Sequence, residues 1–78
     1  MAKNVLVYST PTCPYCIRAK QFLTENNITF ENYDVGADQV RAEEMIAKSG
    51  QMGVPVIDID GKIIVGFDKA RIKEALGI

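Results

Sequence analysis

The sequence of 78 residues contains no histidine and no tryptophan, and it has only two cysteines. Without histidine, no imidazolium can support a thiolate and no imidazole can complete a metal site. The 9 basic and 10 acidic residues give a net charge of -1 and are mixed along the chain. This balance does not indicate a nucleic-acid or membrane-surface partner. The two thiols are therefore the main candidates for chemistry.

Long apolar runs are also missing. The run that follows Lys3 ends at Tyr8, which is too short for a secretory signal, and no stretch has the length of a membrane-spanning helix. We therefore expect a cytoplasmic monomer with a single domain over residues 1–78 and a small core. In the cytoplasm, a close cysteine pair indicates redox or metal chemistry rather than a structural bridge.

Hydrophobic periodicity predicts four strands and three helices. The expected strands are residues 5–8, 28–34, 54–59 and 62–65, and the expected helices are residues 14–26, 37–49 and a segment starting after Asp68. Asp60-Gly61 predicts a hairpin, and Gly50 has the position of a helix C-cap. The order βαβαββα predicts an α/β fold with a four-stranded mixed sheet flanked by helices.

Residues 9–16, Ser-Thr-Pro-Thr-Cys-Pro-Tyr-Cys, hold both thiols where a predicted strand gives way to a predicted helix. Proline is favoured at the first helical position, so Pro14 makes Cys13 the N-cap. An N-cap side chain accepts hydrogen bonds from backbone N–H groups, here those of Tyr15 and Cys16. Partial positive charge at the helix terminus then favours the thiolate of Cys13.

The backbone hydrogen bonds are expected to be the larger of these two effects on the thiolate. Lowering a thiol pKa from about 8.5 to about 5 requires about 5 kcal/mol of preference for the anion. Each hydrogen bond to a charged acceptor contributes about 1.5–3 kcal/mol, and the helix dipole about 0.3–2 kcal/mol. Arg18 and Lys20 add positive charge at longer range. We predict that Cys13 titrates below about pH 7 and Cys16 well above it.

The spacing of the two thiols predicts different roles for them. Cys13 precedes the first turn, where an incoming disulfide can reach it. Cys16 shares an apolar stripe with Ala19 and Leu23, so it is expected to face inward. We infer that Cys13 attacks and forms a mixed disulfide, and that Cys16 resolves it and leaves a Cys13–Cys16 bridge.

Three other interpretations of the cysteine pair stay open at this point. A structural bridge closing four residues gains only about 2 kcal/mol, against about 4.7 kcal/mol for a hundred-residue loop. A metal or iron–sulfur site needs more ligands than two thiols, so a dimer would have to share it through Cys13. A pure protein-interaction module would keep its function when serine replaces Cys13.

Three stretches together resemble the glutaredoxins and the glutaredoxin-like redoxins, over essentially the whole chain. They are Thr-Pro-Thr-Cys-Pro-Tyr-Cys at 10–16, Gly-Val-Pro-Val-Ile at 53–57 and Gly-Phe-Asp at 66–68. The resemblance implies a thioredoxin-like fold and a dithiol oxidoreductase that reduces protein or glutathione mixed disulfides. It implies no tightly bound cofactor and no metal. Glutathione or thioredoxin reductase would supply electrons, and a disulfide protein such as ribonucleotide reductase would receive them.

The resemblance also implies where a substrate binds. It implies a cis peptide between Val54 and Pro55 beside the nucleophile, and pairing of the Val54 backbone with the substrate. Asp68, besides capping its helix, would face the amine of a glutamyl group whose carboxylate the helix N-terminus holds. The other expected substrate contacts flank these positions, and they are Thr12, Pro14, Tyr15, Gln51, Gly66 and Phe67.

The chain departs from the glutathione-using members of that family at three places. Thr10 stands where these members usually have a basic residue, and Gly53 stands where they favour threonine. The turn at residues 65–68, Val-Gly-Phe-Asp, is closer to redoxins that take electrons from thioredoxin reductase. The sequence leaves the choice between the two electron donors open.

Overall fold

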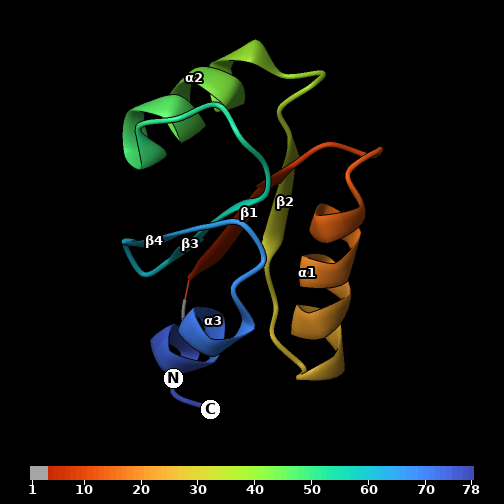
Figure 1. The fold of residues 1–78 in the computed structure, drawn as a ribbon, viewed down its shortest axis with the longest axis vertical. Helices are drawn as coiled ribbons and strands as arrows, with labels where there is room; N and C mark the ends of the chain where they lie inside the picture. Colours follow the sequence, from red (N-terminus) through yellow and green to blue (C-terminus); the bar gives the residue numbers. More distant parts are fainter. Residues whose placement is uncertain (1–3) are drawn as a thin grey trace.

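The structure, a computed structural model, describes residues 4–78 and contains four strands and three helices (Figure 1). In chain order they are β1 (Val5–Ser9), α1 (Pro14–Glu25), β2 (Glu31–Asp34), α2 (Gln39–Ser49), β3 (Val56–Ile59), β4 (Lys62–Val65) and α3 (Lys69–Leu76). The predicted order βαβαββα is confirmed. No helix within residues 4–78 combines the length and the apolar character needed to cross a membrane.

The four strands form one mixed sheet in the order β2-β1-β3-β4. β1 is parallel to β2 and antiparallel to β3, and β3 and β4 form an antiparallel hairpin. Tyr8, near the end of β1, lies opposite Val56, the first residue of β3. The segment that leaves β1 and the segment that enters β3 therefore emerge at the same end of the sheet, and this topology positions the site described below.

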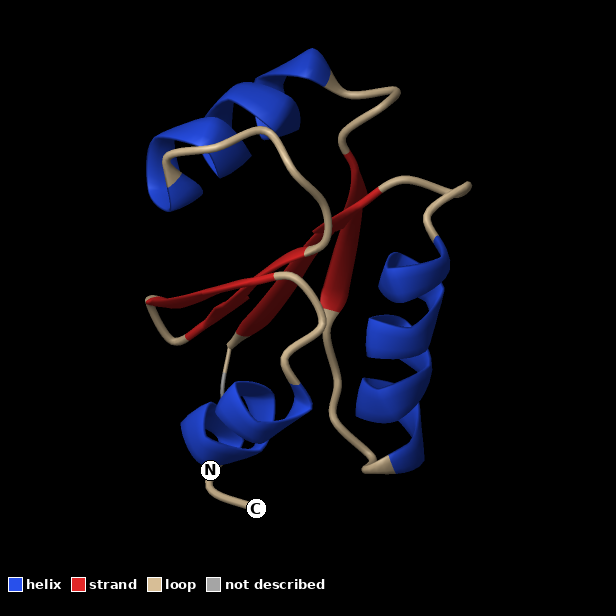
Figure 2. Cartoon of the chain, viewed as in Figure 1, coloured by secondary structure: helices blue, strands red, loops and turns tan. Residues whose placement is uncertain are grey.

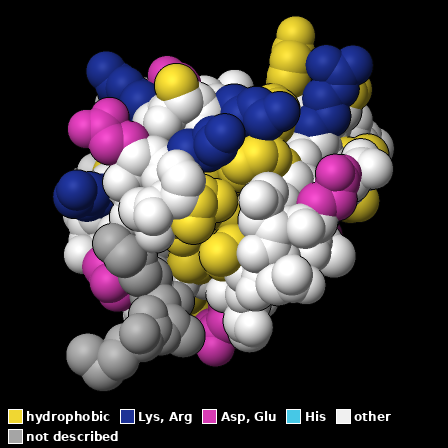
Figure 3. Space-filling view, turned by 90° about the horizontal axis from the view of Figure 1, so that it is seen from below, with side chains coloured by type: hydrophobic (Ala, Val, Ile, Leu, Met, Phe, Trp, Pro, Cys, Tyr) yellow, Lys and Arg dark blue, Asp and Glu magenta, His cyan; other side chains and the backbone are white. Residues whose placement is uncertain are grey.

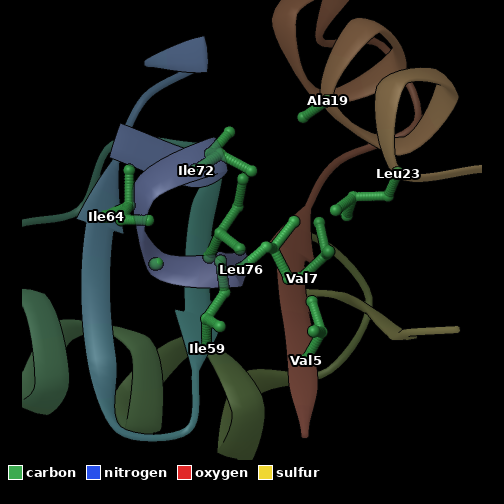
Figure 4. Close-up of a cluster of buried hydrophobic side chains, with 10 residues drawn as sticks. Val5, Val7, Ala19, Leu23, Ile59, Ile64, Ile72 and Leu76 are labelled. Carbon is green, nitrogen blue, oxygen red and sulfur yellow. The ribbon is translucent and has the colours of Figure 1, made fainter. Parts of the chain in front are cut away.

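Helices cover both faces of the sheet: α1 and α3 lie on one side and α2 on the other (Figure 2). Side chains alternate between the faces along a strand, and two cores result. The larger core lies under α1 and α3 and contains Val5, Val7, Ala19, Leu23, Ile57, Ile59, Ile64, Ile72, Ala75 and Leu76. In Figure 4, Leu23 of α1 and Leu76 of α3 point toward Val7 of β1. The smaller core, under α2, is built on Tyr8, Met45 and Val56.

The rim of the larger core is only partly buried. Phe22, Ile28, Phe30 and Phe67 pack against it without being fully covered. Figure 3 shows hydrophobic side chains gathered at the surface between charged ones on the face seen from below. A chain this short cannot cover all its apolar side chains, so partial burial at the rim is expected.

The second strand is shorter than predicted because the end of α1 uses the residues before it. The prediction of a strand over residues 28–34 was wrong at its start, since β2 begins at Glu31. Asn27 is left-handed, with φ 58°, and the N–H of Ile28 donates to the carbonyl of Leu23 at 2.9 Å. This arrangement is a Schellman cap with asparagine in the position that glycine usually takes.

Two other predicted boundaries were wrong by two residues. The helix expected from residue 37 begins at Gln39, because the side chain of Asp38 accepts from the N–H of Arg41 and acts as its N-cap. The strand expected from residue 54 begins at Val56, since Pro55 has no N–H to give to a ladder.

The predicted β3–β4 hairpin and the predicted C-cap of α2 are confirmed. Asp60 and Gly61 have φ values of 50° and 91°, as a two-residue type I′ turn requires. Gly50 ends α2 with a φ of 75°.

Candidate active site

Cys13 is the N-cap of α1, as the sequence predicts. Its backbone is extended, Pro14 occupies the first helical position, and the N–H of Cys16 donates to the Cys13 sulfur at 3.3 Å. The thiol is partly exposed, so a substrate disulfide can reach it. The strand-to-helix turn therefore holds one accessible sulfur at the positive end of a helix.

The surroundings of Cys13 favour its anion. Burial raises the pKa of this thiol, but hydrogen bonds from the Cys16 thiol and from the backbone N–H groups of Cys16 and Tyr15 outweigh burial. The ammonium of Lys20 adds a smaller favourable charge. Together these groups lower the pKa of Cys13 below its ordinary value, the direction needed in an attacking thiol.

Cys16 has the opposite environment. Its exposed fraction is 0%, and it lies on the same side of α1 as the buried Ala19 and Leu23. Burial is the largest cause that raises its pKa to about 11, and the hydrogen bond that it gives to Cys13 adds to the shift. Cys16 is therefore protonated at neutral pH, shielded from solvent and next to the sulfur of Cys13.

The two thiols are expected to react with an alkylating agent in different pH ranges. Alkylation of Cys13 should already be fast at neutral pH and should level off below about 8.5, the pKa of an ordinary thiol. Alkylation of Cys16 should stay slow until the pH approaches about 11. Peptide mass spectrometry after timed alkylation measures both rates. A Cys13 rate that still climbs above the ordinary thiol pKa would contradict the lowered pKa.

The peptide between Val54 and Pro55 is cis, as the resemblance implies. The carbonyl oxygen of Val54 lies 3.9 Å from the Cys13 sulfur, although 41 residues separate them in sequence. On the other side of this peptide, the N–H of Gly66 donates to the carbonyl of Pro55 at 2.7 Å. The structure thus brings four predicted site residues, Cys13, Val54, Pro55 and Gly66, into one chain of contacts.

The side chains of the other predicted substrate-binding residues flank this chain of contacts without taking part in it. Thr12, Pro14 and Tyr15 are exposed on or next to the first turn of α1, and Arg18 lies over the Tyr15 ring at 5.8 Å. The ring of Phe67 packs edge-on against that of Phe22 at 6.1 Å. The carboxylate of Asp68 accepts from the N–H of Arg71 at 3.2 Å. Phe67 and Asp68 thus have structural partners, and the predicted N-cap role of Asp68 is confirmed.

Gln51 folds back over Gly53 beside the Val54 peptide. The Gln51 side-chain N–H donates to the Gly53 carbonyl at 3.4 Å, and a Cβ on Gly53 would lie 2.9 Å from the Gln51 side-chain oxygen. The backbone of Gly53 is not left-handed, so its conformation does not require glycine. Gly53 instead leaves room for the Gln51 carboxamide at the edge of the site.

Sequence reasoning missed a group of polar side chains under α2. The ammonium of Lys48 donates to Asp58 at 2.8 Å and to the hydroxyl of Tyr8 at 2.9 Å. Hydrogen bonds to Asp58 and to Tyr8 raise the pKa of Lys48. The available signal was Asp58 itself, a carboxylate inside an apolar strand, because a buried charge needs a partner.

The described residues also bear on the metal-site interpretation of the cysteine pair. Among residues 4–78, no group of three or more histidine, cysteine, aspartate or glutamate side chains could hold a metal ion. A metal centre would have to take further donors from a second chain.

The sheet, its helices and the Cys13–Cys16 pair define a thioredoxin-fold protein with a dithiol at the head of its first helix. The sequence profile of the Glutaredoxin family matches residues 5–64. The chain belongs to the glutaredoxin family. Family and fold together support thiol–disulfide oxidoreductase activity.

Two curated relatives resemble this chain over most of their length. A protein of Clostridium pasteurianum, described as an uncharacterized glutaredoxin-like 8.6 kDa protein in a rubredoxin operon, is 50% identical over 72 residues. That match covers 92% of this chain and 96% of the relative. Glutaredoxin 3 of Escherichia coli K12 is 39% identical over 74 residues, covering 95% of this chain and 89% of the relative.

Solved structures agree with the fold. A mutant of the thioredoxin-like protein BC3987 superposes with a TM-score of 0.91 at 31% identity, covering 96% of each chain. A glutaredoxin from Archaeoglobus fulgidus superposes with a TM-score of 0.86 at 28% identity, covering 94% of this chain and 85% of its own. The thioredoxin-like fold implied by the resemblance is confirmed.

Proposed function

We propose that the chain reduces protein disulfides through a Cys13–Cys16 dithiol cycle in the cytoplasm. The Cys13 thiolate attacks one sulfur of the substrate, the substrate S–S bond breaks, and the departing thiolate takes up a proton. Cys16 then loses its proton and attacks the Cys13 sulfur, which releases the second substrate thiol and leaves a Cys13–Cys16 disulfide. The substrate gains two electrons and the dithiol loses two.

The observation that carries this proposal is the asymmetry of the two sulfurs. Cys13 is accessible and has a lowered pKa, whereas Cys16 is buried and its pKa is raised to about 11. An attacking thiol must be ionised and reachable, and a resolving thiol must be close but unreactive until the mixed disulfide has formed. The hydrogen bond between the two thiols supplies that closeness.

Substrate recognition is proposed to use the backbone of Val54. Its carbonyl already faces the Cys13 sulfur at 3.9 Å, so an extended substrate segment that pairs with Val54 would bring its disulfide to the nucleophile. Main-chain pairing is compatible with many substrate sequences, because the hydrogen bonds are made to the substrate backbone and not to its side chains.

We further propose that the oxidised chain takes electrons from an NADPH-dependent thioredoxin reductase rather than from glutathione. Thr10 supplies no positive charge for a glutathione carboxylate, and Gly53 supplies no side chain before Val54. The Asp68 carboxylate accepts a hydrogen bond within its own helix. These three positions favour a protein donor over a small anionic one.

The test reduces the oxidised protein in two separate reactions, one with glutathione at cytosolic concentration and one with thioredoxin reductase and NADPH. Free thiols counted over time should rise quickly only with the reductase. Gly53→Thr restores the threonine typical of glutathione-using members and should raise the rate with glutathione. Fast reduction of the natural chain by glutathione would refute the choice of donor. Failure of both donors would likewise refute thioredoxin reductase as the donor.

A further inference from the structure

Three polar residues meet on the α2 side of the sheet, and we call them the Lys48 clamp: Asp58 and Tyr8, which are buried, and Lys48, whose side chain is 29% exposed. Lys48 donates to the other two at 2.8 and 2.9 Å, respectively. The second oxygen of Asp58 accepts from the N–H of Gly61 at 2.8 Å. Asp58 is 7% exposed and Tyr8 0% exposed, so both acceptors are shielded from solvent although the donor Lys48 reaches them from the surface. The clamp therefore joins α2, β1 and β3 through directional contacts.

The clamp lies next to the segments that build the site. Tyr8 lies opposite Val56, directly after Pro55, and only four residues separate it from Cys13. Lys48 lies in the last turn of α2, just before the segment of residues 50–55, which we call the α2–β3 loop. The hydroxyl of the neighbouring Ser49 lies 2.9 Å from the carbonyl oxygen of Gln51 in that loop. The clamp thus fixes the end of α2 where the loop begins.

We propose that Lys48 is a positioning residue for substrate binding, holding the α2–β3 loop so that the Val54 backbone stays beside Cys13. Lys48 acts through Asp58 and Tyr8 and has no role in the chemical step. The inference rests on the proposed function, because it takes the Val54 backbone as the partner of the substrate.

The two halves of the site depend on different elements, and this separation makes the inference testable. The groups that favour the Cys13 thiolate, namely Cys16, Tyr15 and Lys20, all lie on α1. The Val54 carbonyl depends on the α2–β3 loop instead. Removing the clamp should therefore weaken substrate binding and leave the ionisation of Cys13 unchanged.

The experiment compares Lys48→Met with Lys48→Arg, using a peptide disulfide as substrate. Lys48→Met should raise KM about ten-fold with a smaller change in kcat, because the α2–β3 loop is no longer held and the Val54 backbone is less well placed to pair with the substrate. Lys48→Arg keeps a donor for Asp58 and should restore most of the binding. Lys73→Met removes an exposed lysine on α3 and is the matched control. The Cys13 thiolate titration should be the same in all four proteins.

Amide hydrogen exchange provides a readout that does not need activity. The Gly66 N–H donates to Pro55 in the loop, and the Ile17 N–H donates to Cys13 in α1. Lys48→Met should accelerate exchange at Gly66 and spare Ile17. Tyr8→Phe, which removes a single hydroxyl, should accelerate exchange at Gly66 by a smaller factor. This variant replaces Lys48→Met in the experiment if Lys48→Met does not fold.

The outcomes separate the clamp from the proposed function. Equal acceleration at Gly66 and Ile17, a shifted Cys13 titration, or an unchanged KM would each overturn the positioning role. The natural chain could fail to reduce any disulfide while Lys48→Met still accelerates exchange at Gly66 and not at Ile17. That result would refute the proposed function but support the role of the clamp in holding the α2–β3 loop.

Discussion

Replacing Cys13 by serine is expected to reduce the rate of disulfide reduction by about 10³-fold or more, since loss of an activated nucleophile costs at least this much. Serine is among the preferred N-cap residues, so Cys13→Ser should keep the start of α1 and the fold. The loss is therefore chemical: a hydroxyl at this position does not ionise near neutral pH. A coupled assay that follows NADPH consumption with a disulfide substrate measures the effect.

Cys16→Ser is the matched comparison for that experiment. It removes the resolving thiol but leaves Cys13 accessible, so the first attack should persist while turnover through the internal disulfide stops. If Cys13→Ser retained more than a few per cent of the natural rate, the assignment of the nucleophile would be wrong. If Cys13→Ser had no disulfide-reducing activity but still supported the function of the protein in the cell, a protein-interaction module would be favoured instead.

Truncating Leu23 to alanine is expected to lower the free energy of unfolding by about 2–5 kcal/mol. Leu23 is 0% exposed and belongs to the core between α1, α3 and the sheet. A domain of this size has a total stability of about 5–15 kcal/mol, so the loss is a large part of it. Denaturant unfolding, followed by circular dichroism, measures the change.

Ile17→Ala is the control for that core prediction, because Ile17 lies on the same helix but is 51% exposed. It should change the free energy of unfolding by no more than about 0.5 kcal/mol, as is usual for surface positions. Similar losses for the two variants would mean that α1 does not pack against the sheet through Leu23.

Local chemistry explains why the starts of α1 and α3 and the β3–β4 turn could be predicted. Pro14 and Asp68 mark helix starts, and Asp60-Gly61 marks a hairpin, because each residue type suits one backbone geometry. The hydrophobic pattern was misleading where the end of a helix and the start of a strand could both use the same residues. Ile28 looks like strand sequence, but its N–H closes the cap of α1 and its side chain packs at the rim of the core.

The candidate site could be predicted only in part for a similar reason. Cys13 is the N-cap of α1 and Cys16 lies three residues later in its first turn, so their geometry follows from local capping rules. The approach of Val54 to Cys13 joins residues 41 positions apart, and only the resemblance to glutaredoxins implied it. Lys48 of α2 donates to Asp58 of β3 and to Tyr8 of β1, so the contacts join three elements and no local pattern predicts them.

The most direct test of the dithiol cycle measures how fast each single-cysteine variant forms a mixed disulfide. Cys16→Ser and Cys13→Ser, both reduced, are mixed at neutral pH with a peptide disulfide, and intact-mass spectrometry follows the adduct. The account predicts fast and stable adduct formation on Cys13 in Cys16→Ser and very slow formation in Cys13→Ser. Faster adduct formation in Cys13→Ser would reverse the two roles, and equal slow rates in both variants would contradict an activated Cys13.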